Sequence, residues 1–508
     1  MQRLRIALAL VAVCPLLASQ EAEPAKHEPG EPASEEVEPI REQESVTHHT
    51  VTIAGKEIAY TARAATLPLE EEDGTLKANL FYVEYTRDDV EDRAQRPIMF
   101  CFNGGPGSSL VWLHLGVFGP RRVKLTDEGW ATPPPYELVD NEYGFLDLTD
   151  LVFIDPVTTG YSRAAEGVDS EEFHGVDEDV KWVAEFIRLY TTRNERWESP
   201  KFLAGESYGT TRAAGLAGEL QEHHGMFLNG IVMVSAILNF QTARFDRGND
   251  LPYILFLPTY TATAWYHGRL DADLQQDLRR TLDEVEDFAL GDYTVALMKG
   301  DDLSAEERDA IAERLARYTG LSAKYVLQTD LRVQIGRFCK ELLRDEEHTT
   351  GRLDSRFIGT DYDSAGERYD FDPSYANIQG PFTAAFNHYV RADLGFESNL
   401  PYEILTGRVQ PWSYGEARNR YVNVSETLRG AMTRNPGLRV FVANGYYDLA
   451  TPYFATKYTF DHLGLDPDLR GNVSMGYYEA GHMMYIRRLS LVRFKRDVGA
   501  FLRAAASQ

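Results

Sequence analysis

Apolar and polar residues alternate along two stretches near the start of the chain. HTVTIAGKEIAYTARAATLPL (49–69) and ANLFYVEYT (78–86) both show the period of two that half-buried strands have, and turn residues bound each of them. This pattern predicts that the folded part begins at about residue 48 with antiparallel strands.

Short, almost uniformly apolar runs follow these strands. Such runs are typical of strands buried on both faces, and predicted helices over 176–189 and 211–223 separate several of them. Buried strands that alternate with helices indicate a largely parallel sheet covered by helices on both faces, which is the α/β class. The runs are PIMFCF (97–102), LVFID (151–155), KFLAG (201–205), GIVMVSA (230–236) and LRVFVAN (438–444).

Residues 241–410 show a different pattern. DADLQQDLRRTLDEVEDFAL (271–290) and SAEERDAIAERLARYTG (304–320) have the spacing of amphipathic helices, and the region lacks buried-strand runs. We interpret it as a mainly helical cap that is inserted into the sheet domain and shapes the pockets of a site at the sheet edge. The sheet domain then comprises residues 48–240 and 411–508.

The N-terminal segments are expected to lie outside the folded domain. Residues 1–20 have a short basic start and an apolar stretch of about a dozen residues, which is the length of a signal-peptide core and too short for a membrane span. Residues 21–47 are rich in glutamate and proline, which predicts a disordered tether. We therefore expect an exported protein, periplasmic or extracellular, without a membrane span.

Composition narrows the classes of function. A formal charge of −26 argues against nucleic acid as a partner, because phosphate binding requires clustered lysine and arginine. After signal cleavage only Cys101 and Cys339 remain, so the chain is not a disulfide scaffold, although one bridge between them stays open. Neither H-E-x-x-H nor C-x-x-C occurs, and we expect no metal and no cofactor.

The sequence G-E-S-Y-G (205–209) matches the G-x-S-x-G pattern of a nucleophile elbow. Taken alone the match is weak evidence. It follows the buried strand KFLAG and opens a predicted helix, however, so Ser207 would lie on a sharp turn above the sheet edge. This strand–turn–helix context makes Ser207 the candidate nucleophile.

An activated serine needs a base, and the base needs a carboxylate that orients it. In this architecture the acid and then the histidine follow the serine, on loops after late strands. Asp448 lies just past LRVFVAN, and His482 lies in a glycine-containing turn of NVSMGYYEAGHMMY. The alternative is that Asp448 only forms a turn and His482 is a structural loop histidine. We predict that Ser207, Asp448 and His482 form a catalytic triad.

The stretch FCFNGGPGSSL (100–110) leaves a buried strand and becomes rich in glycine. A phosphate-binding loop does not fit, because no G-K-[ST] follows. An oxyanion hole fits better, with one backbone donor from this loop and one from the residue after the nucleophile. The candidate donors are Gly105 and Tyr208. A purely structural turn would not need Asn103, whose side chain can donate to a carboxylate.

Four motifs in this order, N-G-G-P-G-S-S, G-E-S-Y-G, N-G-Y-Y-D-L and A-G-H-M, together resemble the serine carboxypeptidase family, and we identify the chain as similar to a bacterial-type member. The resemblance implies an α/β-hydrolase fold with a mainly helical cap insertion. It also implies acyl-enzyme chemistry that releases C-terminal amino acids from peptides, usually at acidic pH. Peptides are therefore the expected partners, whereas residue preference and oligomeric state do not follow from it.

The same resemblance implies that Asn103, the Gly104 backbone and Glu206 bind the terminal carboxylate of the peptide. A substrate carboxylate beside Glu206 would face a second negative charge. Because like charge and burial both raise a carboxyl pKa, Glu206 is expected to be protonated when substrate is bound. The alternative is a surface role for Glu206.

The chain departs from the family pattern at three positions. Cys101 replaces the family's usual Trp, and Ser108 replaces its usual Cys, so the family's disulfide is absent there. Val117 lies three residues before Pro120, where the family commonly has a Glu. By the resemblance, that Glu helps hold the pair of carboxyl groups around the substrate terminus. An esterase or acyltransferase on the same scaffold therefore stays open as the alternative, and a non-catalytic binding protein is the third candidate.

Overall fold

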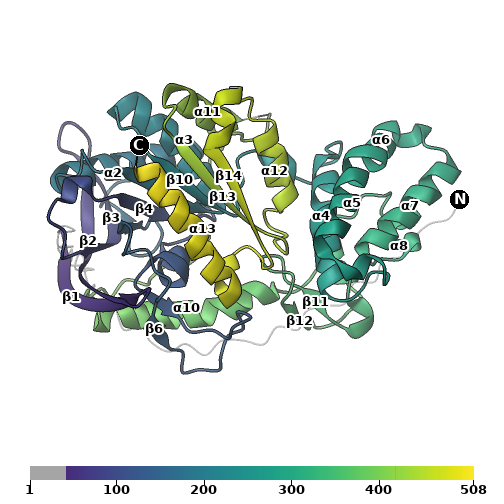
Figure 1. Cartoon of the computed structure of the whole chain (residues 1–508), viewed down its shortest axis with the longest axis horizontal. Helices are drawn as coiled ribbons and strands as arrows, with labels where there is room; N and C mark the ends of the chain where they lie inside the picture. Colours follow the sequence, from purple (N-terminus) through teal and green to yellow (C-terminus); the bar gives the residue numbers. More distant parts are fainter. Residues whose placement is uncertain (1–41, 418, 508) are drawn as a thin grey trace, which may run out of the picture. The chain divides into compact units, whose positions relative to one another are not determined.

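The computed structural model of the protein describes residues 42–417 and 419–507. The signal peptide predicted at 1–20 and the tether up to residue 41 lie outside the described residues. The first strand, β1, already begins at Glu44 and pairs with β2 over its whole length (Figure 1). The predicted tether boundary at residue 47 was therefore too late. The first residues of β1 are not buried, so hydrophobic alternation could not reveal them.

Ten strands form one mixed sheet in the order β1-β2-β3-β7-β4-β9-β10-β13-β14, with β8 paired to β3. The pairs from β1 to β7 are antiparallel, and the pairs from β7 through β14 are parallel. Two two-stranded sheets, β5-β6 and β11-β12, lie outside it. The strands are β1 (Glu44–Ile53), β2 (Lys56–Glu70), β3 (Leu76–Arg87), β4 (Ile98–Phe102), β5 (Arg121–Val123), β6 (Leu138–Asp140), β7 (Asp150–Ile154), β8 (Arg163–Ala164), β9 (Lys201–Glu206), β10 (Gly230–Val234), β11 (Thr349–Thr350), β12 (Ile358–Gly359), β13 (Arg439–Gly445) and β14 (Val473–Tyr478).

Helices cover both faces of the large sheet. Every residue of β4, β7 and β10 is buried, and alternate side chains of these strands enter two separate hydrophobic cores. Helices α2, α3 and α11 complete one core, and α10 and α13 complete the other. The helices are α1 (Val111–Leu113), α2 (Val176–Arg193), α3 (Tyr208–His224), α4 (Leu251–Tyr266), α5 (Leu278–Phe288), α6 (Thr294–Lys299), α7 (Ala305–Thr319), α8 (Ala323–Gln328), α9 (Ile335–Glu341), α10 (Pro373–Ala392), α11 (Ser425–Arg434), α12 (Tyr453–Asp461) and α13 (Arg488–Ala506).

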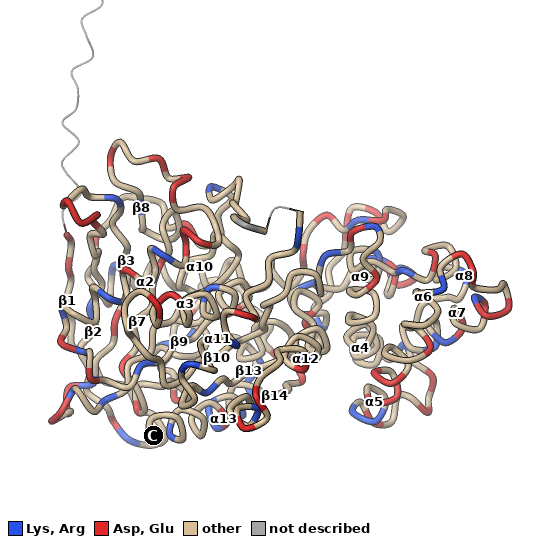
Figure 2. Tube along the Cα trace, turned by 90° about the horizontal axis from the view of Figure 1, so that it is seen from above, with Lys and Arg blue, Asp and Glu red and all other residues tan. Residues whose placement is uncertain are grey.

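The predicted insertion, residues 241–410, divides between two hydrophobic cores. Helices α4 to α9 form a third core of their own, which also includes Tyr447, Leu449 and residues of α12 from the sheet domain. Helix α10 instead packs into a core of the sheet. Figures 1 and 2 both show α4 to α8 beside the sheet, on the side of α12. The helical periodicity predicted a mainly helical region but not this division, because it does not specify which apolar surface a helix packs against.

The two described cysteines lie in different cores. Cys101 in β4 and Cys339 in α9 are both buried and free, so the bridge that the sequence left open does not form. Among residues 42–417 and 419–507, no helix has the combination of length and apolar content that crossing a bilayer requires.

A buried ion cluster lies at the amino end of β7, away from the edge where Ser207 follows β9. Asp150 accepts a hydrogen bond from Arg96 Nε (2.6 Å) and another from Arg196 Nη1 (2.7 Å). The side chains of Asp150 and Arg196 are only 2% and 3% exposed. Removing one charge from such a cluster leaves its partner buried without compensation.

The free energy of unfolding of the Asp150→Asn variant is expected to be about 3–5 kcal/mol lower than that of wild type, because Arg196 loses its carboxylate partner. Urea unfolding followed by circular dichroism measures this difference. Asp461→Asn is the matched control, since its pair with Lys457 is exposed and contributes at most about 1 kcal/mol. Equal losses of stability in the two variants would contradict the structural importance of the buried cluster.

Candidate active site

The Ser207 turn joins the central strand β9 to helix α3. Ser207 has φ 60° and ψ −128°, a backbone conformation that costs free energy for a residue other than glycine. Its N–H donates to Val234 O of β10 (3.0 Å), and its carbonyl accepts from Thr210 N where α3 begins (2.8 Å). A Cβ at Gly205 would lie 2.2 Å from Gly209 O, so the turn closes only with glycine there.

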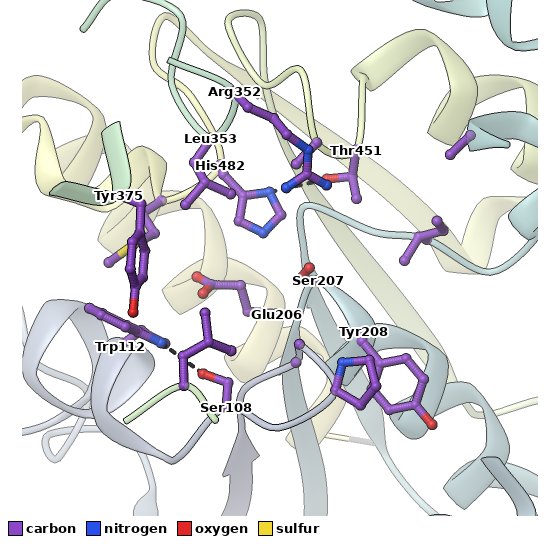
Figure 3. A pocket seen from close by; sticks show the side chains of 18 of the residues that line it. Ser108, Trp112, Glu206, Ser207, Tyr208, Arg352, Leu353, Tyr375, Thr451 and His482 are labelled. Carbon is purple, nitrogen blue, oxygen red and sulfur yellow. Dashed lines mark hydrogen bonds between the residues drawn. The ribbon is translucent and has the colours of Figure 1, made fainter. Parts of the chain in front are cut away.

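His482 and Asp448 lie on the loops after β14 and β13 and form a buried hydrogen-bonded pair. The distance from His482 Nδ1 to Asp448 Oδ2 is 2.8 Å. Thr451 Oγ1 also donates to Asp448 Oδ2 (2.7 Å), and the N–H groups of Ala450 and Thr451 donate to Oδ1. In the described chain the imidazole makes side-chain hydrogen bonds only through Nδ1, so Nε2 stays free on the side that faces Ser207 in Figure 3.

The environment of His482 favours its protonated form. Burial alone lowers the pKa of the imidazole, but the charge and hydrogen bond of Asp448 outweigh burial, and Glu206 adds to their effect. The pKa of His482 is therefore raised above its ordinary value. A base with such a pKa accepts a proton more readily than a free imidazole does.

Most of the predicted site residues meet at one pocket (Figure 3). Ala243, Arg244, Arg352, Leu353, Tyr375, Ile378 and Leu405 line this pocket from within residues 241–410, and none of them belongs to α4 through α9. The insertion thus contributes to the pocket through its two ends, through the loop between β11 and β12, and through α10. The predicted residues on the wall are Gly104, Gly105, Glu206, Ser207, Tyr208 and His482, whereas Asn103 and Asp448 are hydrogen-bonded behind Glu206 and His482.

The glycine-rich loop after β4 lies directly against the Ser207 turn. A Cβ on Gly104 would lie 2.5 Å from Tyr208 N and 2.6 Å from Glu206 O, so the two backbones approach closely only because this residue is glycine. The N–H groups of Gly105 and Tyr208 make no hydrogen bond within the described residues, and both residues line the pocket. Two unpaired backbone donors are thus available to a bound group.

Glu206 is buried next to Ser207, which excludes the alternative of a surface role. Its Oε1 accepts from Asn103 Nδ2 (3.0 Å), and its Oε2 accepts from the hydroxyl of Tyr485 (2.5 Å). Burial raises the pKa of Glu206 to about 7, although His482, Tyr485 and Asn103 each lower it in part. Tyr485, which follows His482 by three residues, was not predicted, because no spacing rule links a tyrosine there to a carboxyl before the serine.

The departures from the family pattern have local structural consequences. Ser108, at the position where the family usually has a cysteine, accepts a hydrogen bond at Oγ from Trp112 Nε1 (2.8 Å). Val117 is fully buried in the core that contains α10 and α13, so its position supplies no carboxyl to pair with Glu206. The hydroxyl of Tyr485 is instead a direct partner of Glu206.

The loop of residues 351–357, between β11 and β12, connects the insertion to the loops that carry His482 and Asp448. It does so through backbone groups and through Asp354, whose carboxylate is paired with the buried Arg356. No motif marks this loop in the sequence. Its hydrogen bonds run from His482 N to Leu353 O (2.7 Å), from Leu449 N to Arg352 O (3.1 Å), from Ser355 N to Tyr447 O (3.0 Å) and from Gly481 N to Asp354 Oδ2 (2.9 Å).

Within residues 42–417 and 419–507, no group of three or more His, Cys, Asp or Glu side chains is arranged to hold a metal ion. The mixed sheet, the strained serine after a central parallel strand, and the Asp–His pair on later loops together define the α/β-hydrolase fold with a helical insertion. A model of one protein family, described as serine carboxypeptidase, matches residues 68–495. The chain belongs to the serine carboxypeptidase family, as its motifs predicted.

Known relatives agree with this assignment. Serine carboxypeptidase-like 8 of Arabidopsis thaliana is 25% identical over 162 residues, which are 31% of this chain and 36% of that protein. The pheromone-processing carboxypeptidase KEX1 of Saccharomyces cerevisiae (strain JAY291) is 31% identical over 172 residues, which are 32% of this chain and 22% of that protein. The chain thus aligns with only 22–36% of the length of these two curated relatives.

A solved structure shares the fold. The crystal structure of Kex1(delta)p, a prohormone-processing carboxypeptidase from Saccharomyces cerevisiae, superposes with a TM-score of 0.53 at 18% identity and covers 85% of this chain and 89% of that chain. The named relatives come from a plant and a yeast, so the bacterial-type qualifier stays a prediction.

The Gly481→Ala variant is expected to lose about 1–3 kcal/mol of stability, because the added Cβ would lie 2.4 Å from Asp354 Cβ and would push the 351–357 loop away from the His482 loop. Urea unfolding measures the loss. Gly471→Ala is the control, since its added Cβ would meet nothing within 4 Å. If both variants are as stable as wild type, the contact between these loops is looser than described.

Proposed function

We propose that the protein is a serine-type carboxypeptidase that releases C-terminal amino acids from peptides through an acyl-enzyme intermediate. Ser207 is the nucleophile, His482 is the general base, and Asp448 orients the imidazole. The observation that carries this proposal is that Ser207 and His482 line the same pocket as Glu206, a buried carboxyl whose pKa is about 7.

The proposed reaction follows from the contacts of the imidazole. Its Nδ1–H donates to Asp448, which leaves Nε2 to take the proton of Ser207 as Oγ attacks the last peptide carbonyl. The N–H groups of Gly105 and Tyr208 donate to the oxyanion that forms. The imidazolium then protonates the leaving amino group, and the free amino acid departs. Water, activated by the same base, hydrolyses the acyl-enzyme.

Recognition of the chain end is assigned to Asn103, the Gly104 backbone and Glu206. In its neutral form Glu206 can donate a hydrogen bond to the terminal carboxylate of the peptide, whereas in its ionised form it would repel that carboxylate. A pKa of about 7 keeps Glu206 largely neutral in mildly acidic solution. The pocket would therefore prefer a free C-terminus to an amide below neutral pH.

We further propose that the protein is exported to the periplasm or the extracellular space and acts there on peptides. The support is the basic start and short apolar stretch of residues 1–20, which lie outside the described residues. An esterase or acyltransferase on the same scaffold is the second candidate. It is favoured by the absence of a carboxyl at Val117, which leaves Glu206 without the neighbouring acid of the family pattern.

The Ser207→Ala and His482→Ala variants are each expected to lower kcat by on the order of 10⁶-fold, and Asp448→Asn by on the order of 10⁴-fold. Ser207 supplies the atom that becomes acylated and His482 moves its proton, whereas Asp448 acts only through the imidazole. Hydrolysis of a blocked dipeptide measures kcat, and circular dichroism checks the fold. Labelling by a fluorophosphonate should disappear in Ser207→Ala, and labelling that persists at another serine would overturn the assignment.

The kcat/KM for free-carboxylate peptides is expected to fall about tenfold per pH unit above pH 7, because Glu206 loses its proton there. Glu206→Gln keeps a donor but cannot ionise, so this variant should lose the alkaline decline. It should keep the acidic decline, because His482 must be neutral to act as a base. Initial rates on a blocked dipeptide and on its C-terminal amide, measured across pH, give both profiles.

The matched control for this experiment is Glu84→Gln. Glu84 is also buried and has a raised pKa, mainly through burial, but it lies on β3 and bonds to Tyr190. Its replacement should leave the pH profile unchanged. Identical profiles for wild type and Glu206→Gln on free-carboxylate peptides would refute the role of Glu206 and favour the esterase or acyltransferase.

A further inference from the structure

The pocket contains two arginines in an otherwise acidic protein. The chain has 78 acidic and 52 basic residues, and Figure 2 shows the acidic ones spread over the sheet domain and the insertion. Among the residues that line the pocket, the only carboxyl is that of Glu206, which is buried and already hydrogen-bonded. Arg244 and Arg352 are the Lys or Arg side chains on the wall, and both are exposed.

Arg352 presents a free charge from a fixed backbone. Its N–H donates to Asp372 Oδ1 (3.1 Å), and its carbonyl accepts from Leu449 N (3.1 Å). Its guanidinium forms no hydrogen bond and no ion pair within the described residues. In Figure 3 the side chain lies beside His482, on the opposite side of the imidazole from Glu206. Arg352 is therefore outside the part of the pocket assigned to the substrate's terminal carboxylate.

Arg244 is connected to Tyr208 through the ring of Phe240. Its guanidinium lies over the ring of Phe240, 5.7 Å from the ring centre, and Phe240 packs on the cluster that contains Tyr208 and Trp412. Among the described residues the guanidinium makes one hydrogen bond, a long one to the Tyr414 hydroxyl (3.4 Å). No described carboxylate lies within ion-pair distance, so this charge is also available to a ligand.

We propose that Arg244 and Arg352 select substrates with an acidic side chain in the acyl residue, the residue whose carbonyl Ser207 attacks. This inference rests on the proposed function, because the terminal carboxylate at Asn103 and Glu206 fixes where the leaving residue lies. The acyl part of the peptide would then extend past Ser207 toward Tyr208 and the Phe240 ring that Arg244 covers. A guanidinium binds a carboxylate through two parallel N–H donors and an opposite charge. A neutral amide cannot form this charged, paired interaction.

The test compares blocked dipeptides that differ only in charge. One pair has Glu or Gln as the acyl residue with a constant Phe leaving residue, and a second pair has a constant acyl Phe with Glu or Gln as the leaving residue. Assays at about pH 6 keep the substrate carboxylate ionised and Glu206 largely neutral. An ionic strength of about 0.15 M screens the remote negative charge of the protein, so charges in the pocket dominate the difference.

Wild type is expected to favour acyl Glu over acyl Gln roughly tenfold in kcat/KM, as one or two exposed ion pairs would give. Arg244→Gln and Arg352→Gln should each reduce this ratio, and the double variant should bring it to about one. The ratio is the readout because Arg352 also lowers the pKa of His482, which changes the turnover of both peptides alike. Arg368→Gln is the control, because Arg368 is exposed and does not line the pocket. It should keep the full ratio.

Three results would overturn the inference. The first is a ratio near one in wild type, and the second is a ratio that survives in the double variant. The third is a preference confined to the leaving residue, which would move the charge recognition to the other side of Ser207. If no blocked dipeptide is hydrolysed at all, the proposed function fails instead. Calorimetric binding of the acyl-Glu and acyl-Gln peptides to Ser207→Ala then still decides whether the pocket selects for charge.

Discussion

The structure around the pocket depends on the strained turn at Ser207. A positive φ at a serine persists only where neighbouring groups hold it, and here the bond to Val234 and the start of α3 do so. The contact of Gly205 with Gly209 and of Gly104 with the Tyr208 backbone leaves no space for side chains at these positions. The turn therefore determines how close the glycine-rich loop lies, where two backbone donors remain unpaired, and where Glu206 enters the interior.

The central strands could be predicted from the sequence because strands that are buried on both faces are almost uniformly apolar. All five apolar runs became parallel strands of the large sheet, and the α/β-hydrolase fold and the family assignment were confirmed. The residues proposed to act together come from motifs at strand ends. Parallel strands bring their carboxyl ends to one edge of a sheet, so Ser207 and His482, far apart in the chain, line one pocket.

Contacts that depend on tertiary packing could not be predicted in the same way. The hydroxyl of Tyr485 reaches Glu206 across 279 positions of sequence, and the Leu353 carbonyl reaches the His482 backbone from within the insertion. Helix α10 shows the same limit, because it lies within the insertion but packs into a core of the sheet and not with α4 to α9. Strand β1 was placed too late since its first residues lack a buried face. In each case the local sequence specifies a conformation but not the partner.

The 351–357 loop makes the insertion inseparable from the last part of the chain. Its backbone and Asp354 bind the segments that present Asp448 and His482, and Gly481 leaves no space for a side chain between them. The insertion is thus not a module that could be exchanged between relatives while the sheet domain stays as it is. A chimera that replaced residues 241–410 would have to bring a loop that matches the recipient's own His482 and Asp448 segments. Sequence changes in these two regions are accordingly expected to arise together during evolution.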